Sequence, residues 1–216
     1  TEEKVIRNVL IVDEGDPFNK LLFDKSISNV KSKGIFKSVK RQVLKDDDKN
    51  KIINIIVEEK PTGEIFAGVG TGTGGSSISA GLKEKNYLGK GITLDTNFAL
   101  SDDEIRGKFS VINPNFKNTD RSLNTTIEST TSDFMSSSGY KTTRTGVSLG
   151  TGFEQYQDIF VNFDLSNYYE KLVTSDKATD IKKKQEGDYF ENLFLYSITL
   201  NKLNQNFQPT DGVFTK

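Results

Sequence analysis

Residues 91–100 read GITLDTNFAL, and apolar and polar side chains alternate along them. A β-strand turns successive side chains to opposite faces. Leu94 and Phe98 would therefore share an apolar face, while Asp95 and Asn97 share a polar one. Similar stretches of about ten residues recur up to the C-terminus, separated by turn-forming residues. This succession is typical of the strands of a transmembrane β-barrel.

The composition excludes several other classes of protein. The chain has 216 residues and a mean hydropathy of -0.51, and no stretch approaches the roughly 20 consecutive apolar residues of a membrane-spanning helix. Its 29 basic and 30 acidic residues form no stripe of the kind that binds nucleic acid. Because it has no Cys and no His, it cannot form disulfides, thiolate metal sites or a Ser-His-Asp triad. We therefore expect no enzyme activity, no metal site and no cofactor.

Residues 1–60 follow a helical period before they change to strands. The apolar residues between Val5 and Leu10 predict a first amphipathic helix. For a second helix, Asp16 is the predicted N-cap, Pro17 the first helical residue and Gly34 the stop. The strands predicted to follow are Ile35–Leu44 and Lys51–Glu59, joined by a polar turn at residues 46–50.

The remaining residues, 61–216, predict a mainly β fold with about eight strands. These are residues 63–71, 76–84, 90–100, 104–113, 121–131, 140–152, 157–168 and 189–203. We expect them to form a partial antiparallel transmembrane β-barrel, preceded by the small α+β module of residues 1–60. A soluble β-sandwich or meander also alternates in this way and remains the structural alternative.

The connections between the predicted strands alternate in character. One set is compact and consists of Asn86–Gly89, Asn113–Phe116, Phe153–Tyr156 and Gln208–Gly212. The other set varies in length, and Ser166–Asp188 is its longest and most charged member. Short turns at one end and long loops at the other are typical of a bacterial outer-membrane barrel.

Three local patterns have plainer explanations than a catalytic or ligand site. The glycine cluster at residues 68–75 is not a phosphate loop, because no Lys-Ser or Lys-Thr follows it. Glycines weaken a strand instead, so this first strand should be weakly held. Acidic pairs such as Asp102-Asp103 have no defined partner and are predicted to be solvated. Lys182–Lys184 is predicted to lie in a solvated loop, with contact to anionic lipid head groups as the alternative.

The order of several short motifs is more specific than any one of them. They are Glu14–Asn19, Lys33–Phe36, Val57–Gly63, the glycine-rich strand, Asn86–Gly91, Asn113–Phe116 and Pro209–Gly212. In this order, and over essentially the whole chain, they resemble the BamA family of outer-membrane protein assembly factors.

The resemblance implies a domain organisation and a set of site residues. Residues 1–60 would be the last POTRA domain without its first strand, and residues 61–216 the N-terminal half of the barrel. The lateral-gate strand would consist of Gly63, Glu64, Ile65, Phe66, Ala67, Gly68, Val69, Gly70 and Thr71. The periplasmic turn motifs would contribute Asn86, Leu88, Gly89, Asn113, Pro114, Phe116, Pro209, Thr210, Asp211 and Gly212. The gate's partner strand and the family's Arg-Gly-Phe/Tyr loop are expected outside this sequence.

The resemblance also implies a function. It predicts assembly and insertion of β-barrel proteins in the bacterial outer membrane by strand templating at a weak lateral seam, with residues 1–60 in the periplasm. The implied partners are unfolded outer-membrane protein precursors, lipoprotein subunits of the assembly machinery and outer-membrane lipid, with no nucleic acid. A two-partner secretion pore for one dedicated protein is the alternative within the superfamily, and a passive porin is the alternative outside it.

Overall fold

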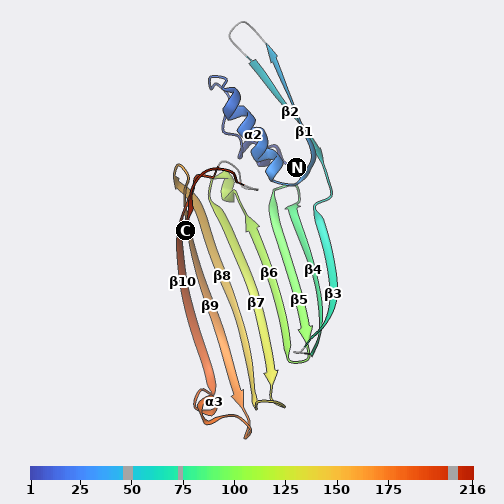
Figure 1. Cartoon of the computed structure of the whole chain (residues 1–216), viewed down its shortest axis with the longest axis vertical. Coiled ribbons are helices and arrows are strands. Elements are labelled where there is room, and N and C mark those ends of the chain that lie inside the picture. The colour runs from blue at the N-terminus through green and yellow to red at the C-terminus, as the bar shows by residue number, and fades with distance from the viewer. Residues whose placement is uncertain (46–50, 73–74, 204–208) are drawn as a thin grey trace. The chain divides into compact units, whose positions relative to one another are not determined.

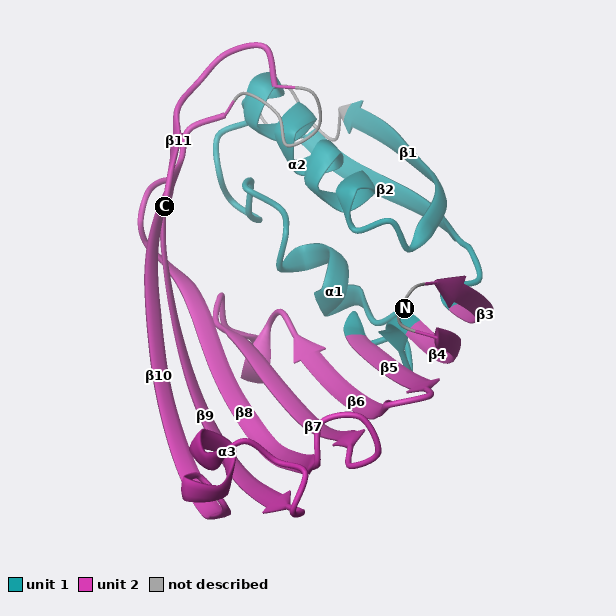
Figure 2. Cartoon of the chain, turned by 60° about the horizontal axis from the view of Figure 1, so that its bottom comes forward, with its two compact units in different colours: residues 1–63, 84–92 teal, residues 64–83, 93–216 magenta. Residues whose placement is uncertain are grey.

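The computed structural model divides into two compact units (Figure 2). It describes residues 1–45, 51–72, 75–203 and 209–216. Unit 1 comprises residues 1–63 and 84–92, and unit 2 comprises residues 64–83 and 93–216. The predicted polar turn at residues 46–50 lies outside the described residues.

Unit 1 contains the two helices and the two strands predicted for the N-terminal module (Figure 1). They are α1 (Glu3–Arg7), α2 (Lys20–Ser32), β1 (Phe36–Lys45) and β2 (Lys51–Glu59). The strands pair in antiparallel register, with Val39 opposite Val57. These two valines are partly buried and extend the core that α2 forms with β1.

The core of unit 1 is small and centres on α2. Val30 is 0% exposed and clusters with Val5, Ile35 and Phe36. Ser26, which is 1% exposed, accepts a hydrogen bond from the backbone N–H of Ile11 (2.8 Å) and donates one to a backbone carbonyl of its own helix. Because its hydroxyl is satisfied twice, a buried polar residue is tolerated at this place.

Helix α2 begins later than the sequence predicts. Asn19 is its N-cap, and the Asn19 side chain accepts hydrogen bonds from the N–H groups of Leu21 and Leu22. The carboxylate of Asp16 instead accepts from the N–H of Asp13 (3.0 Å) in the preceding turn. The predicted cap at Asp16 is therefore wrong, whereas the predicted stop is correct, because Gly34 has a φ of +66° just beyond the helix.

The two candidate caps give opposite expectations for alanine substitution. We expect Asn19→Ala to lower the free energy of unfolding of unit 1 by about 1 kcal/mol, because two N–H groups of the first turn lose their acceptor. Asp16→Ala, the matched control, should change it by less than about half as much. Chemical denaturation followed by circular dichroism of the helix measures both values. An equal loss in the two variants would contradict the assignment of the cap.

Unit 2 is built on a long antiparallel sheet in which each strand pairs with the next one along the chain (Figure 1). Among the described residues the order is β11-β10-β9-β8-β7-β6-β5-β4-β3. The strands are β3 (Gly63–Gly72), β4 (Gly75–Tyr87), β5 (Ile92–Ser101), β6 (Glu104–Asn113), β7 (Ser122–Phe134), β8 (Tyr140–Tyr156), β9 (Ile159–Thr174), β10 (Gly187–Asn201) and β11 (Phe214–Thr215). Two short helices accompany them, the 3-10 helix η1 (Phe116–Asn118) and α3 (Asp180–Lys184).

All eight predicted strands are present, but some of their ends differ. β8 runs on to Tyr156, so the predicted turn at Phe153–Tyr156 is wrong, and the chain reverses at residues 157–158 instead. β9 continues to Thr174, which shortens the predicted loop at 166–188 to residues 175–186, and α3 carries the lysine run within that loop. Only Asp102-Asp103 joins β5 to β6, which makes it a short member of the set that is predicted to vary in length. In the part of the chain that the structure describes, no helix is long and apolar enough to cross a membrane.

Candidate functional site

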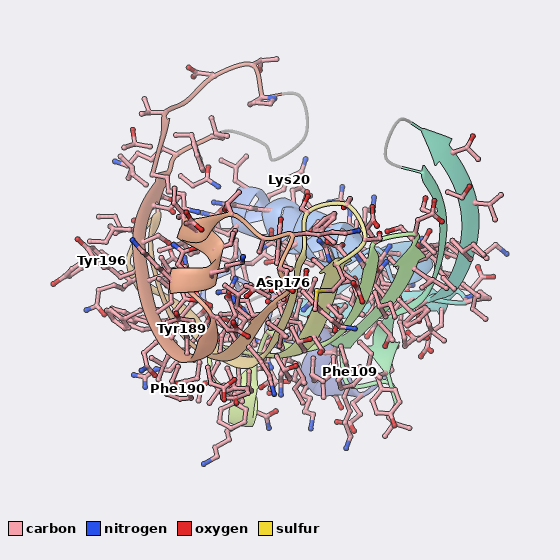
Figure 3. The ribbon with its side chains drawn as sticks, turned by 90° about the horizontal axis from the view of Figure 1, so that it is seen from below. Lys20, Phe109, Asp176, Tyr189, Phe190 and Tyr196 are labelled. Atoms are coloured by element: carbon pink, nitrogen blue, oxygen red, sulfur yellow. The ribbon has the colours of Figure 1, made fainter. Side chains whose placement is uncertain are left out.

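One face of the sheet in unit 2 carries an apolar band across the strands. The register aligns Leu94, Val111, Thr125, Leu149, Leu165 and Phe194 from β5 to β10. In the neighbouring row Phe109 lies opposite Ile127, and Ile127 lies opposite Val147. Leu94 and Val111 are half-buried, and the other apolar side chains of these rows are exposed. Figure 3 shows Phe109, Phe190 and Tyr196 pointing away from the sheet on this side. Such a face suits contact with lipid.

The opposite face of the sheet carries a cluster of polar side chains that interact across strands. The guanidinium of Arg144 pairs with the carboxylate of Glu191 (2.7 Å) and lies over the ring of Tyr168, 3.9 Å from its centroid. The hydroxyl of Tyr168 donates to Glu128 (2.8 Å). This cluster links β7, β8, β9 and β10. A charged cluster on one face and apolar side chains on the other are what a barrel with a wet interior requires.

β3, the predicted gate strand, lies at one edge of the sheet and is exposed along its whole length. Ile65 and Val69 share the lipid-facing side and are 83% and 84% exposed. Phe66, Gly68 and Gly70 share the other side, because neighbouring residues of a strand point in opposite directions. An edge strand presents backbone N–H and C=O groups on which another strand can form.

Glycines of β3 face serines of β4. A Cβ atom at Gly68 would lie 3.5 Å from Oγ of Ser79, and one at Gly70 would lie 3.1 Å from Oγ of Ser77. From the first contact to the second, the residue number rises by two on β3 and falls by two on β4, as it does in antiparallel strands. Because glycine offers no side chain to pack, this half of β3 gains little from its neighbour.

The start of β3 is held within unit 1 by a carboxylate. Glu84 accepts hydrogen bonds from the hydroxyl of Thr62 and from the N–H of Asn86 (2.7 Å). Asn86 in turn accepts from the N–H of Gly91 (2.8 Å), which closes the turn around Leu88. The structure thus brings the first predicted turn motif next to the residue that precedes the gate strand.

The other end of the hairpin formed by β3 and β4 is held by Asp102. Its carboxylate accepts a hydrogen bond from the N–H of Ser76 (3.1 Å), and a Cβ atom at Gly75 would overlap it. Gly75 also has a φ of +94°, so a side chain there would be strained in two ways. Asp102, predicted to be simply solvated, therefore has a defined partner.

The two remaining turn motifs belong to separate connections, after β6 and after β10. The side chain of Asn113 accepts from the N–H of Asn115 (3.1 Å), and Phe116 begins η1. After Pro209, Gly212 has a φ of +118°, and a side chain there would overlap the carbonyl of Lys202. Both motifs shape turns by local hydrogen bonding and backbone geometry.

Unit 1 carries a cavity of about 350 Å³ between α2 and β1. Its lining is amphipathic and consists of Asp24, Ile27, Ser28, Lys31, Val39 and Arg41. Arg41 pairs with Asp24 and lies over the ring of Phe23. A groove with apolar and charged walls beside an exposed strand suits an extended peptide.

Sequence reasoning missed the cavity, the carboxylates of Glu84 and Asp102, and the cluster around Arg144. Gly146, Gly150 and Gly152 share one face of β8 and were a usable signal, because a glycine in a strand often marks a place where a neighbouring group approaches the backbone closely. At Gly146 the ring of Tyr168 occupies the space of a Cβ atom.

Family models match both parts of the chain. The model "Omp85 superfamily domain" matches residues 86–216. The chain belongs to the Omp85 superfamily. The POTRA model, described as "Surface antigen variable number repeat", matches residues 1–60. This Omp85 protein is therefore a protein of the bacterial outer membrane with a periplasmic POTRA region, as the sequence predicts.

Two relatives extend the comparison. A protein of Treponema pallidum (strain Nichols), described as an outer membrane protein assembly factor, is 32% identical over an alignment of 108 residues. That match covers 46% of this chain and 13% of the other protein. The crystal structure of BamA from Haemophilus ducreyi lacking POTRA domains 1-3 matches with a TM-score of 0.71 and 24% identity. That match covers 98% of this chain and 44% of the other. The likeness supports the predicted fold, a POTRA module followed by a partial antiparallel barrel. The Omp85 chain spans less than half of either relative.

Proposed function

We propose that this chain is part of a factor that assembles β-barrel proteins and inserts them into the outer membrane. In this proposal residues 1–60 are the last POTRA domain without its first strand, and residues 61–216 are the N-terminal half of the barrel. The observation that carries the proposal is β3, an exposed edge strand with glycines on its inner side. Membership of the Omp85 superfamily and the likeness to an assembly factor support it.

The proposed mechanism is strand templating. An unpaired backbone edge in lipid strongly favours a partner strand, because each unsatisfied N–H or C=O costs several kcal/mol. In the full-length protein the edge of β3 would close the barrel by pairing with the last strand, and the weak packing of Gly68 and Gly70 would lower the cost of opening. A client strand would then add to Gly63–Thr71. This mechanism needs no covalent chemistry.

Unit 1 is proposed to receive the unfolded clients. An extended chain could pair with a strand edge and rest its side chains in the cavity between α2 and β1. Backbone pairing does not demand a particular sequence, which suits a receptor for many precursors. Lipoprotein subunits and outer-membrane lipid complete the proposed set of partners.

Depletion of the gene in its host tests the proposed function. Quantitative proteomics of the outer membrane should show a general fall in folded barrel proteins while their precursors accumulate in the periplasm. If one secreted protein disappeared while other barrels persisted, a two-partner secretion pore would replace the assembly factor. If only the uptake of small solutes fell, a passive porin would replace it.

A further inference from the structure

Phe66 is the aromatic side chain on the inner side of β3, which it shares with Glu64, and its ring fits over a glycine of β4. Its ring occupies the space above Gly81 of β4, where a Cβ atom would overlap Cζ of Phe66. A Cβ atom at Gly81 would also lie 2.5 Å from the backbone oxygen of Thr96 on β5. Only glycine fits at this place, because the ring and the neighbouring backbone both approach closely.

The same arrangement, a side chain lying over a glycine of the neighbouring strand, also occurs where strands are paired on both sides. The ring of Tyr168 covers Gly146, and the side chains of Asp164 and Asn162 cover two further glycines of β8. Those strands have long apolar rows that also define their register. β3 differs because beyond Phe66 its inner side continues only with glycines.

A glycine-rich strand has a weakly specified register and can slip along its neighbour. A slip that keeps each side chain on its face moves the strand by two residues. Phe66 would then lie opposite Ser79 or Lys83, where a side chain already occupies the space. The Ser79 hydroxyl faces Gly68, and Lys83 reaches toward Asp95 (3.5 Å). Gly81 is thus the position on this part of β4 that can accept the ring.

We propose that Phe66 is a positioning residue that fixes the register of β3 on β4, so that the templating edge presents one register to an incoming strand. The inference rests on the proposed function, because a defined template register matters only if strands add to β3. Packing of the sheet alone would not require an aromatic side chain at position 66, since Ile65 and Val69 already contribute lipid-facing apolar surface.

Two disulfide reporters in the full-length protein, reconstituted in lipid nanodiscs without client, test this inference. The chain has no cysteine of its own. The native pair is Gly68→Cys with Ser79→Cys, whose positions face each other closely enough for a disulfide. The slipped pair is Gly68→Cys with Ser77→Cys, displaced by two residues.

In the parent protein the native pair should oxidise and the slipped pair should not. Adding Phe66→Ala should lower the ratio of native to slipped yield roughly two- to fivefold, the range expected for losing a cross-strand aromatic contact. Phe66→Tyr should restore the ratio, and Ile65→Ala, the matched control on the lipid side, should leave it unchanged. Phe66→Leu replaces the alanine variant if that variant does not accumulate. A ratio of native to slipped yield that is unchanged in both Phe66→Ala and Phe66→Leu would overturn the proposal.

Client folding by the same nanodiscs separates the two proposals. If the parent protein folds no barrel client but Phe66→Ala still shifts the disulfide ratio, the assembly function is wrong and the register role on β4 stands. If the parent folds clients, Phe66→Ala should spread client crosslinks along β3 over positions two residues apart. Clients crosslinked at one register in both proteins would contradict the templating part of the inference.

Discussion

Replacing Leu149 with Lys is expected to lower the free energy of unfolding in a bilayer by about 2–4 kcal/mol. Leu149 lies near the middle of β8, in the apolar row between Thr125 and Leu165. A lysine there would place its charge in the hydrocarbon region. The penalty is largest at the bilayer midplane and falls toward the interfaces.

Leu195 provides a matched control, because it is the same residue type with nearly the same exposure. Leu149 is 51% exposed and Leu195 is 52% exposed. Leu195, however, lies on the inner face of the sheet, opposite Asp164. Leu195→Lys should therefore change the free energy of unfolding by less than about 1 kcal/mol. Urea unfolding from lipid vesicles, followed by tyrosine fluorescence, measures both, and equal losses would contradict the assignment of the two faces.

The strands of the barrel were predictable because one face meets lipid and the other meets water. That difference imposes the period of two seen in GITLDTNFAL, and β5 and β6 pair in the register that it requires. The ends of the strands were less predictable, since the alternation disappears where polar and apolar residues occur on both faces. Residues 166–174 of β9 illustrate this, because Ser166 and Glu170 resemble a loop in sequence but lie in a paired strand.

The start of α2 could not be decided from residue preferences alone. Asp16 and Asn19 are both good caps, and Pro17 favours the earlier start. The side chain of Asp16 is used in its own turn with Asp13, which leaves Asn19 to accept from the helix. Two local motifs competed, and hydrogen-bond geometry decided between them.

For the candidate site, the sequence predicted which segment forms the edge strand but not the contacts that hold it. The glycines of the first strand mark it as weakly held. The contacts of Phe66 with Gly81, of Glu84 with Thr62 and of Asp102 with Ser76 join residues well apart in the chain. Such contacts depend on the register between strands, which residue preferences do not specify.

Crosslinking of a stalled client to β3 tests the central claim most directly. Single cysteines at Ile65, Ala67 and Val69 of the full-length protein would each be paired with single cysteines in the last strand of a client barrel. Directly opposite residues of paired strands lie close enough to form disulfides. Ile127→Cys on β7 is the control, because that strand also faces lipid but is paired on both sides.

Strand templating predicts a ladder of crosslinks. Each client position should react strongly with one position of β3, the preferred partner should move in step as the client cysteine moves by two residues, and Ile127→Cys should stay unreacted. Folding of the client without any crosslink to β3, or equal crosslinking of β3 and Ile127→Cys, would contradict the account.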